Sequence, residues 1–541
     1  MTAGKRNWIV AIGLSAVVVA GGVGIAASRL GARIEPYARQ AAIGYLSQRF
    51  ASDVELEALH LRLPGISPLR LVLTRGRGVS VGVEGQGLKM WLKGRPKAVP
   101  LFAIRKFRCE VDLESLLHPP VAVSQVFVDG MEIDIPPLGE RLRPAPSAGV
   151  EPGSRQGASN LGVAIGKVSI QHAELVLEPG NPRRVPLRFD IEGLELESGG
   201  AGAPMKYDAS LTNAKPPGRI RTTGTFGPWR AGEPGDTPVT GDYVFEKADL
   251  GVFAGIAGTL ESSGRYEGKL SAITARGEAS VPDFRLRRTG TAVPLFARFA
   301  VLVDGTNGNT VLQPVAAMLG STNFTTSGAI IRHEASQPRA ISLDVTMPNG
   351  DLRDVLRLAM KGAPFMEGRL VLHTKIDIPA LTAKVREKLE MDGRFEVEEG
   401  KFLHSTIQDQ IDGLSQRARG LPRNPDGDRA VSHMAGVFHL ENAAMRFQKV
   451  SFGFPGADVD LAGDYNLDSD ALDFAGTLKL QATVSQMVTG WKRLILRPVD
   501  RFFERGGAGT FLGIRVDGTS KAPKFGVNVA GRELEVPLPK R

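Results

Sequence analysis

Apolar and polar residues alternate along much of this chain, which predicts β-strands that each present one apolar face. The alternation begins near Val54, in VELEALHLRL, and recurs in short runs separated by glycine and proline. Two runs, VSQVFVDGMEIDIP from position 123 and IGKVSIQHAELVLE from position 165, repeat one apolar register 42 residues apart. Because no helical pattern alternates regularly with the strands, the sequence favours a mainly antiparallel sheet over a parallel, doubly wound one.

We interpret each of these two runs as a β-hairpin. Asp129-Gly130 is the expected turn of the first run, and Gln171-His172 occupies the same place in the second. The apolar residues of both hairpins then share one face of the sheet: Val126, Val128, Met131, Ile133, Val168, Ile170 and Leu175.

A third hairpin is predicted in VDLAGDYNLDSDALDFAGTLKL, positions 459 to 480. A loop over 468–471 would pair Tyr465 with Phe474 and Leu461 with Leu478, and a slip by one residue would exchange the two faces. The opposite face is mostly polar. The apolar face is predicted to carry Val459, Leu461, Tyr465, Leu472, Phe474 and Leu478.

Such apolar faces must be covered, and two architectures do so. In a sandwich or closed barrel, the apolar faces of two sheets pack together. In an elongated, curled sheet, they line a groove that is filled by a few side chains and by lipid acyl chains. The periodicity alone fits both.

A few helices and loops interrupt the strands. Near-helical spacing predicts a helix that ends at about Phe50, a short one around Leu352–Ala359 after an Asn349 cap, and another around 407–414. The Pro- and Gly-rich stretches 136–160 and 418–430 are expected to be flexible loops.

The N-terminus contains 21 uncharged residues, 8–28, flanked by lysine and arginine. About 20 apolar residues suffice to span a bilayer as a helix. We expect an uncleaved transmembrane anchor, with residues 1–7 in the cytoplasm; a cleaved signal peptide is the alternative. In either case the rest of the chain is expected to be exported.

The composition offers little for catalysis. Cys109 is the only cysteine, which excludes a disulfide framework and a cysteine-based zinc site. His433 and His439 do not have the spacing of a metal motif, and no nucleophile elbow or phosphate loop is complete. We therefore expect no enzyme activity, no cofactor, no metal and no nucleic-acid partner.

The net charge of +9 favours anionic surfaces. A basic amphipathic helix is predicted at about 484–504, and it would lie on a membrane surface or cap the last sheet. Its membrane-surface candidates are Trp491, Lys492, Arg493, Arg497, Arg501 and Phe502.

Several segments together resemble the AsmA-like proteins of the Gram-negative envelope. These are the apolar N-terminus, LSQRFASDVELEALHLRLPG, the VSQVFVDGMEIDI run, VDGTNGNTVLQPVAAMLG, MDGRFEVEEGKF and the closing GAGTFLGIRVDGTSKAPKFGVNV. The resemblance covers nearly the whole chain and rests on glycine positions and alternation, taken in their order.

The resemblance implies a bridge-like lipid transfer protein: an inner-membrane anchor followed by repeating β-groove units in the periplasm. The chain would then divide into an N-terminal helix with the first β units (29–135), a middle β-groove region (161–417) and a C-terminal region (431–541). Phospholipid acyl chains would contact the apolar residues named above on their way to the outer membrane, where an envelope partner protein could meet the C-terminal end. The alternative is a non-enzymatic envelope scaffold or assembly factor with a self-packed β core.

Overall fold

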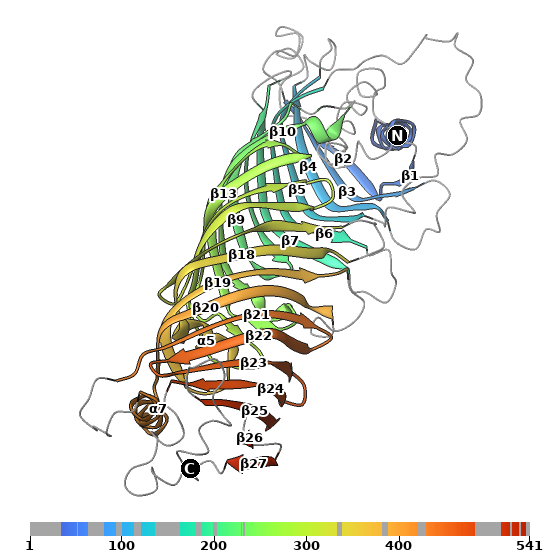
Figure 1. The fold of residues 1–541 in the computed structure, drawn as a ribbon. Helices are drawn as coiled ribbons and strands as arrows, with labels where there is room; N and C mark the ends of the chain where they lie inside the picture. The colour runs from blue at the N-terminus through green and yellow to red at the C-terminus, as the bar shows by residue number, and fades with distance from the viewer. Residues whose placement is uncertain are drawn as a thin grey trace, which may run out of the picture. The chain divides into compact units, whose positions relative to one another are not determined.

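A computed structural model describes most of the 541-residue chain. The described residues are 34–50, 52–62, 80–92, 100–112, 121–135, 163–178, 186–198, 203–228, 230, 233–332, 338–380, 388–419, 429–481, 510–519, 522–529 and 532–536. They are mainly β-strands, with few helices (Figure 1).

The chain forms two compact units, which are described separately. Unit 1 comprises residues 1–249, 260–277 and 302–308; unit 2 comprises residues 250–259, 278–301 and 309–541.

Among the described residues, none of the helices has both the length and the apolar character needed to cross a membrane. The predicted anchor at 8–28, the predicted loop at 136–160 and the predicted amphipathic helix at 484–504 lie outside the described residues, as does most of the predicted loop at 418–430. Its first residue, Ala418, still belongs to a helix, Ser405–Ala418.

Unit 1 begins with one helix, which is followed by long strands. Its elements are α2 (Ile34–Phe50), β1 (Ser52–Glu55), β2 (Ala58–Arg62), β3 (Ser80–Leu92), β4 (Phe102–Asp112), β5 (Val121–Ile135), β6 (Val163–Leu177), β7 (Leu187–Ser198), β8 (Met205–Ala214), β9 (Pro217–Phe226), η1 (Pro234–Asp236), β10 (Pro238–Asp249) and β12 (Thr259–Lys269). The helix ends at Phe50, as the spacing predicts. Strands β3, β4 and β5 pair antiparallel, as do the successive pairs from β6 to β10.

The two predicted hairpins at 129–130 and 171–172 are wrong. Strand β5 continues through Asp129-Gly130 without a turn, and strand β6 continues through Gln171-His172. The two strands pair in parallel. Val126 lies opposite Val168, and Val128 lies opposite Ile170. The 42-residue repeat therefore reflects two neighbouring parallel strands in the same register, which makes the sheet mixed.

The presumed turns are kinks within the strands. Gly130 and His172 have φ of 71° and 52°, the left-handed conformation that also occurs in a glycine-type β-bulge. Each kink shifts the alternation by one residue, so Val128 and Met131 stay on the same face. The normal pairing is interrupted at one level on five neighbouring strands, and these positions form the kink row: Gly87, Arg105, Gly130, His172 and Glu192.

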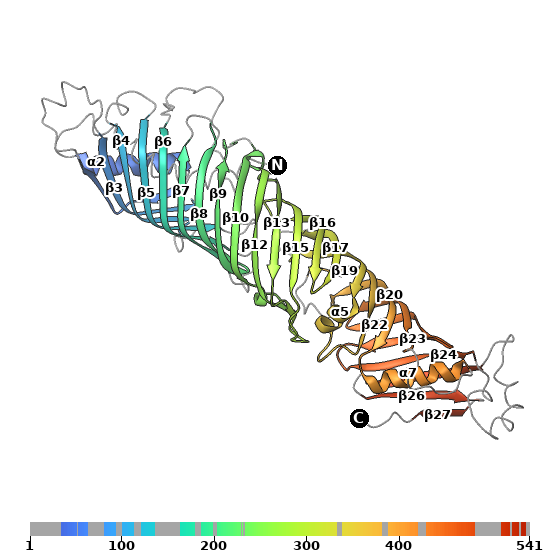
Figure 2. The same ribbon diagram turned by 90° about the vertical axis from the view of Figure 1, so that its left-hand side faces the viewer.

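The kink row bends the strands and carries charge. Figure 2 shows β3 to β9 bending along their length, as bulged strands do. On the polar side, the carboxylate of Asp129 lies 2.8 Å from His172 Nδ1 and 3.3 Å from Arg105 NH2. The hydrogen bond with His172 and the charge of Arg105 lower the pKa of Asp129.

At β1 to β6, the apolar face of unit 1 is covered by the protein's own chain, whereas most residues of this face in β8, β9 and β12 are half-buried. Helix α2 packs against β1 and β2, and its Ala42 and Leu46 are fully buried among apolar side chains of β3 to β6. Arg39 Nε donates to the carbonyl of Leu56 at 2.6 Å and fixes the helix to the start of β2. This end of the sheet is thus a closed, self-packed core.

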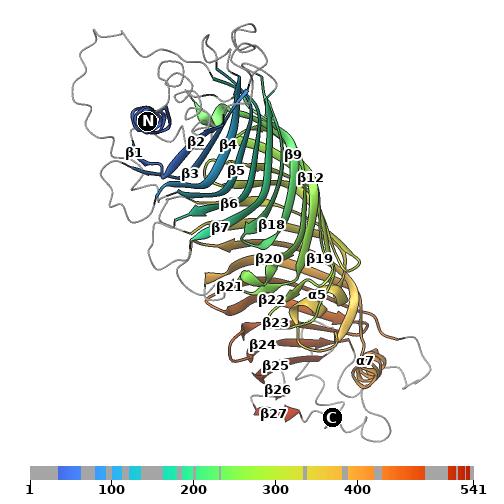
Figure 3. The same ribbon diagram turned by 180° about the vertical axis from the view of Figure 1, so that it is seen from behind.

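Unit 2 continues with antiparallel strands and two short helices (Figure 3). Its elements are η2 (Leu250–Val252), β11 (Ile256–Ala257), β14 (Arg285–Leu286), β16 (Thr310–Leu319), β17 (Thr322–Ile331), β18 (Ala340–Asp351), α5 (Leu352–Ala359), β19 (Met366–Ile378), β20 (Glu390–Phe402), α7 (Ser405–Ala418), β21 (Ser432–Glu441), β22 (Ala444–Phe454), β23 (Ala457–Asn466), β24 (Ala471–Leu480), β25 (Thr510–Thr519), β26 (Ala522–Val529) and β27 (Arg532–Val536). Strands β13 (Ala272–Val281) and β15 (Leu295–Val303) have residues in both units. Both short helices were predicted.

The predicted C-terminal hairpin exists, but its register differs by two residues. Tyr465 lies opposite Leu472 rather than Phe474, and Gly463 takes the place opposite Phe474. The side-chain oxygen of Asn466 accepts the amides of Asp468 and Ser469, which places the loop one residue earlier, over 467–470. A shift by two leaves every side chain on its predicted face.

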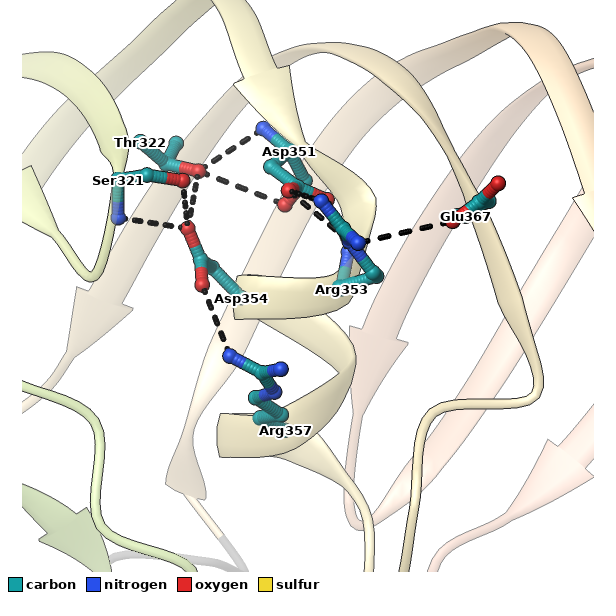
Figure 4. A network of polar contacts seen from close by, with 7 residues as sticks. All are labelled: Ser321, Thr322, Asp351, Arg353, Asp354, Arg357 and Glu367. Carbon is teal, nitrogen blue, oxygen red and sulfur yellow. Dashed lines mark hydrogen bonds and ion pairs between the residues drawn. The ribbon is translucent and has the colours of Figure 1, made fainter. Parts of the chain in front are cut away.

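Helix α5 is fixed by a buried carboxylate (Figure 4). Asp351, rather than Asn349, caps the helix by accepting the amide of Arg353. Asp354 is only 4% exposed and accepts the Ser321 amide at 2.8 Å, the Ser321 hydroxyl at 2.7 Å and the Thr322 hydroxyl at 3.0 Å. These three bonds tie the first turn of α5 to the β16–β17 turn.

Replacing Asp354 with alanine leaves three donors without their acceptor, so we expect a loss of about 1–3 kcal/mol in the free energy of unfolding. The measurement is the midpoint of urea denaturation of the full chain. Arg357→Ala is the matched control, because Arg357 is exposed and lies 3.7 Å from the same carboxylate. An equal effect of both substitutions would contradict the role given to the buried bonds.

The kink row predicts a second effect. Gly130→Val forces a β-branched residue into the left-handed conformation, which costs about 1–2 kcal/mol. We expect a lower urea midpoint and faster amide exchange in β5. Gly193→Val is the control, because Gly193 has no left-handed φ and nothing lies within 4 Å of a Cβ placed there. If Gly130→Val behaves like the control, the kink is not a conformational requirement.

Candidate functional site

The apolar face of unit 2 is the candidate site. Along β23 and β24, residues alternate between half-buried and exposed, and the half-buried ones are the predicted apolar set: Val459, Leu461, Tyr465, Leu472, Phe474 and Leu478. An apolar face that keeps part of its surface accessible is suited to contact with an apolar ligand.

A row of phenylalanines runs across this face from strand to strand. Ring centroids are separated by 6.4 Å between Phe395 and Phe438, 6.4 Å between Phe438 and Phe447, and 5.7 Å between Phe447 and Phe474. We call these four residues, on β20, β21, β22 and β24, the phenylalanine row. Their tilted, edge-directed contacts are a favourable geometry for aromatic pairs.

Glycines on neighbouring strands make room for these rings. Gly436 pairs with Phe395, Gly393 pairs with Phe438, and Gly463 lies between Phe447 and Phe474. A Cβ placed on Gly436 would lie 2.7 Å from the Phe395 ring. The rings can therefore lie down over the backbone of the next strand, which produces a low, continuous apolar surface.

The opposite face of the same strands is charged. Cross-strand pairs join Asp392 to His439 at 2.7 Å, Arg446 to Asp464 at 3.1 Å, and Arg515 to Asp473 at 3.1 Å. Their side chains are 38–71% exposed, so they contribute little to stability but keep this face in water. The two faces of unit 2 are thus clearly distinct.

Among the described residues, two helices, α5 and α7, cover parts of the apolar face. Leu352 of α5 belongs to a buried cluster with Met347, Met366, Leu370 and Val397. Ile411 of α7 packs against a smaller cluster formed by Phe454, Ala457 and Leu480, at the ends of β22 to β24. Phe447, Phe474 and the residues around them remain half-buried.

The predicted residues of unit 1 have a different environment. Val126, Val128, Met131 and Ile133 are at most 8% exposed. Val168 and Ile170 share their core, and Leu175 packs against it. All seven lie on one face, as predicted, but they contact the protein's own helix and strands.

Further along unit 1, the apolar face contains a cluster of hydroxyl groups. The Tyr207 and Tyr266 hydroxyls hydrogen-bond to each other, and that of Tyr266 lies 2.7 Å from Thr222 Oγ1. The rings extend over glycines of the intervening strands, since a Cβ on Gly224 would lie 2.7 Å from the Tyr207 oxygen. Burial raises the pKa of Tyr207, so its hydroxyl stays protonated at neutral pH. The hydroxyl groups of this cluster are therefore satisfied by hydrogen bonds within the protein.

The chemistry of the described residues is sparse. No group of three or more histidine, cysteine or acidic side chains in these ranges is placed to hold a metal ion. Cys109 is 1% exposed, and burial raises the pKa of its thiol to about 12, so it is not a reactive thiolate.

The pattern predicted the face of Phe474 but missed the phenylalanine row, the tyrosine cluster and α5's buried carboxylate. A signal for the row was present, since GRFEVEEGKF and AGVFHL each place glycine two residues from phenylalanine. Glycine opposite an aromatic residue on neighbouring strands is a known pairing.

The membrane-surface candidates at 491–502 lie outside the described residues.

In comparisons with known proteins, no protein-family model, curated protein or solved structure matches this chain.

The polar face predicts a pH effect. The hydrogen bond to Asp392 raises the pKa of His439 above its ordinary value of 6.5. A raised folded-state pKa means that this pair stabilises the fold below about pH 6.5, and that the contribution disappears as pH rises through the raised value. Asp392→Asn should return the His439 pKa towards 6.5, as measured by NMR titration of labelled histidines. Asp464→Asn, which removes the partner of Arg446, is the control and should leave it unchanged.

Proposed function

We propose that this protein holds phospholipid acyl chains on the apolar face of unit 2 and conducts phospholipid towards the outer membrane. The observation that carries the proposal is the phenylalanine row on the apolar side of the sheet, with ion pairs on the opposite side. Phe438 is buried, at 8% exposure, and the other three rings of the row are half-buried. The resemblance of the sequence to AsmA-like proteins supports the same function.

The proposed mechanism is partition rather than catalysis. Each methylene removed from water contributes about 0.8 kcal/mol, so an acyl chain of about sixteen carbons would need more than about 10 kcal/mol to cross water bare. An apolar face removes most of that barrier while the headgroup stays in water. Because such a surface recognises apolar area and little else, specificity for the lipid should be modest.

The rest of the proposal follows from the sequence. Residues 8–28 would anchor the chain in the inner membrane, with the bulk of it in the periplasm, and the basic residues at 491–502 would contact a membrane surface. An envelope partner or the outer membrane would receive the lipid. No enzyme activity and no cofactor is proposed.

A second candidate function is that of an envelope scaffold with a self-packed β core. One observation favours it: helix α2 and strands β1 and β2 already bury the apolar face of β3 to β6 in unit 1. If the same holds for the whole face in solution, no surface is left for lipid.

The test is photo-crosslinking in the full chain reconstituted into vesicles of phosphatidylethanolamine and phosphatidylglycerol. A photoreactive phenylalanine analogue replaces Phe474 in one variant, and Asp473 in the matched control. Phe474 is half-buried on the apolar face, whereas Asp473 is exposed and paired with Arg515. We expect lipid adducts by mass spectrometry at 474 and few at 473. Adducts at 474 to the protein alone would favour the scaffold.

A further inference from the structure

A strap formed by two chain segments lies on unit 2. It comprises residues 250–258, with η2 and β11, and residues 282–290, with β14. Ile256 pairs with Leu286, and the Arg287 amide donates to the Gly255 carbonyl at 2.9 Å. The Arg287 guanidinium also bonds the carbonyls of Gly251 and Ile256. One arginine therefore joins the two segments into a single piece.

The strap is attached to two residues that are far from it in the sequence, Leu358 and Asp470. Thr289 Oγ1 donates to the Leu358 carbonyl, near the end of α5, at 2.8 Å. Arg288 NH2 donates to Asp470 Oδ1, in the β23–β24 turn, at 3.1 Å, across 182 positions of sequence. The Tyr465 hydroxyl donates to the same carboxylate oxygen at 3.0 Å. Figure 2 shows this region of the chain beside α5.

Helix α5 and the turn that contains Asp470 begin at opposite strand ends of the sheet. Strands β18 to β23 pair in chain order, each antiparallel to the next. Strand β18 and strand β23 are five steps apart, so they run in opposite directions. Helix α5 follows the end of β18 at Asp351, and the turn with Asp470 follows the end of β23 at Asn466. Because Thr289 and Arg288 are consecutive, the strap joins the C-terminal end of α5 to the β23–β24 turn at close range.

The strap also lies on the apolar side. Helix α5, which it contacts, buries Leu352 against the apolar face. Tyr465, which shares Asp470 with Arg288, occupies one of the half-buried positions of β23 and so lies on the apolar face. Both attachments thus approach the sheet from the side of the phenylalanine row.

We propose that the strap is a lid over the apolar face of unit 2, latched by the Arg288–Asp470 ion pair, and that it controls the entry of acyl chains. This inference rests on the proposed function. The side chains of the latch are 42% and 35% exposed, and a pair so open to water holds weakly. The arginine that holds the strap together, Arg287, makes three bonds within it, so the strap should detach from Asp470 as one piece.

The test uses the full chain in the same vesicles, with the photoreactive analogue at position 474. Arg288→Glu places two carboxylates together and should open the latch. We expect lipid adducts to increase by up to about fivefold, the upper range for losing an exposed ion pair. Arg288→Glu combined with Asp470→Arg restores an opposite pair and should return the yield towards that of the unmodified latch. Arg298→Glu is the control, because Arg298 pairs with Glu278 at 2.8 Å outside the strap.

Amide exchange over 284–290 reports the opening independently of lipid. Faster exchange in Arg288→Glu, reversed by the charge swap and absent in Arg298→Glu, is expected to accompany the higher adduct yield. Faster exchange with an unchanged adduct yield would overturn the lid, and so would unchanged exchange. If no variant forms lipid adducts although exchange responds, the proposed function fails and the lid fails with it. Adducts at equal yield in all variants would sustain the function and reject the lid alone.

Discussion

The structure depends on one constraint: a long sheet whose strands alternate in period two has a continuous apolar face, and that face must be removed from water. The first strands of unit 1 and the sheet of unit 2 meet this constraint differently. In unit 1, α2 places Leu46 into the core formed by β3 to β6, and the strands there are buried by the protein itself. In unit 2, α5 and α7 each pack against their own part of the face, and three rings of the phenylalanine row, all but Phe438, stay half-buried. The proposed function concerns only this second situation.

Glycines and kinks shape the apolar face of the sheet. Gly393 and Gly436 allow the rings of Phe438 and Phe395 to lie over the neighbouring strand. In unit 1, the kink row bends five strands at one level while keeping Val128 and Met131 on the same side. The apolar set stays buried across the kinks, and the charged side chains of Arg105, Asp129 and His172 contact one another at the same level.

The sequence was a good guide to faces and a poor guide to connections. Period-two alternation assigned Val126 and Phe474 to apolar faces correctly, because a side chain's face depends only on its neighbours along the strand. The hairpin at Asp129-Gly130 was wrong because a glycine with positive φ serves a tight turn and a bulge equally well, and local sequence does not distinguish them. Parallel pairing of β5 with β6 depends on a distant partner. The two-residue register error at Tyr465 left no trace in the pattern, since both registers bury the same residues.

The strap could not be predicted from the sequence, again because its contacts depend on distant partners. FRLRR, at 284–288, is a basic run without interleaved aromatics, and its meaning lies in partners that no local pattern contains: a carbonyl at Leu358 and a carboxylate at Asp470. Arg287 and Arg288 are adjacent in the chain but have separate tasks, since one holds the strap together and the other latches it. An apolar face that is permanently open would favour self-association, because exposed apolar area attracts any other apolar surface. The proposed lid would resolve that conflict: Thr289 and the weak Arg288–Asp470 pair would hold it over the face at rest, and an acyl chain with many methylenes to bury would displace it.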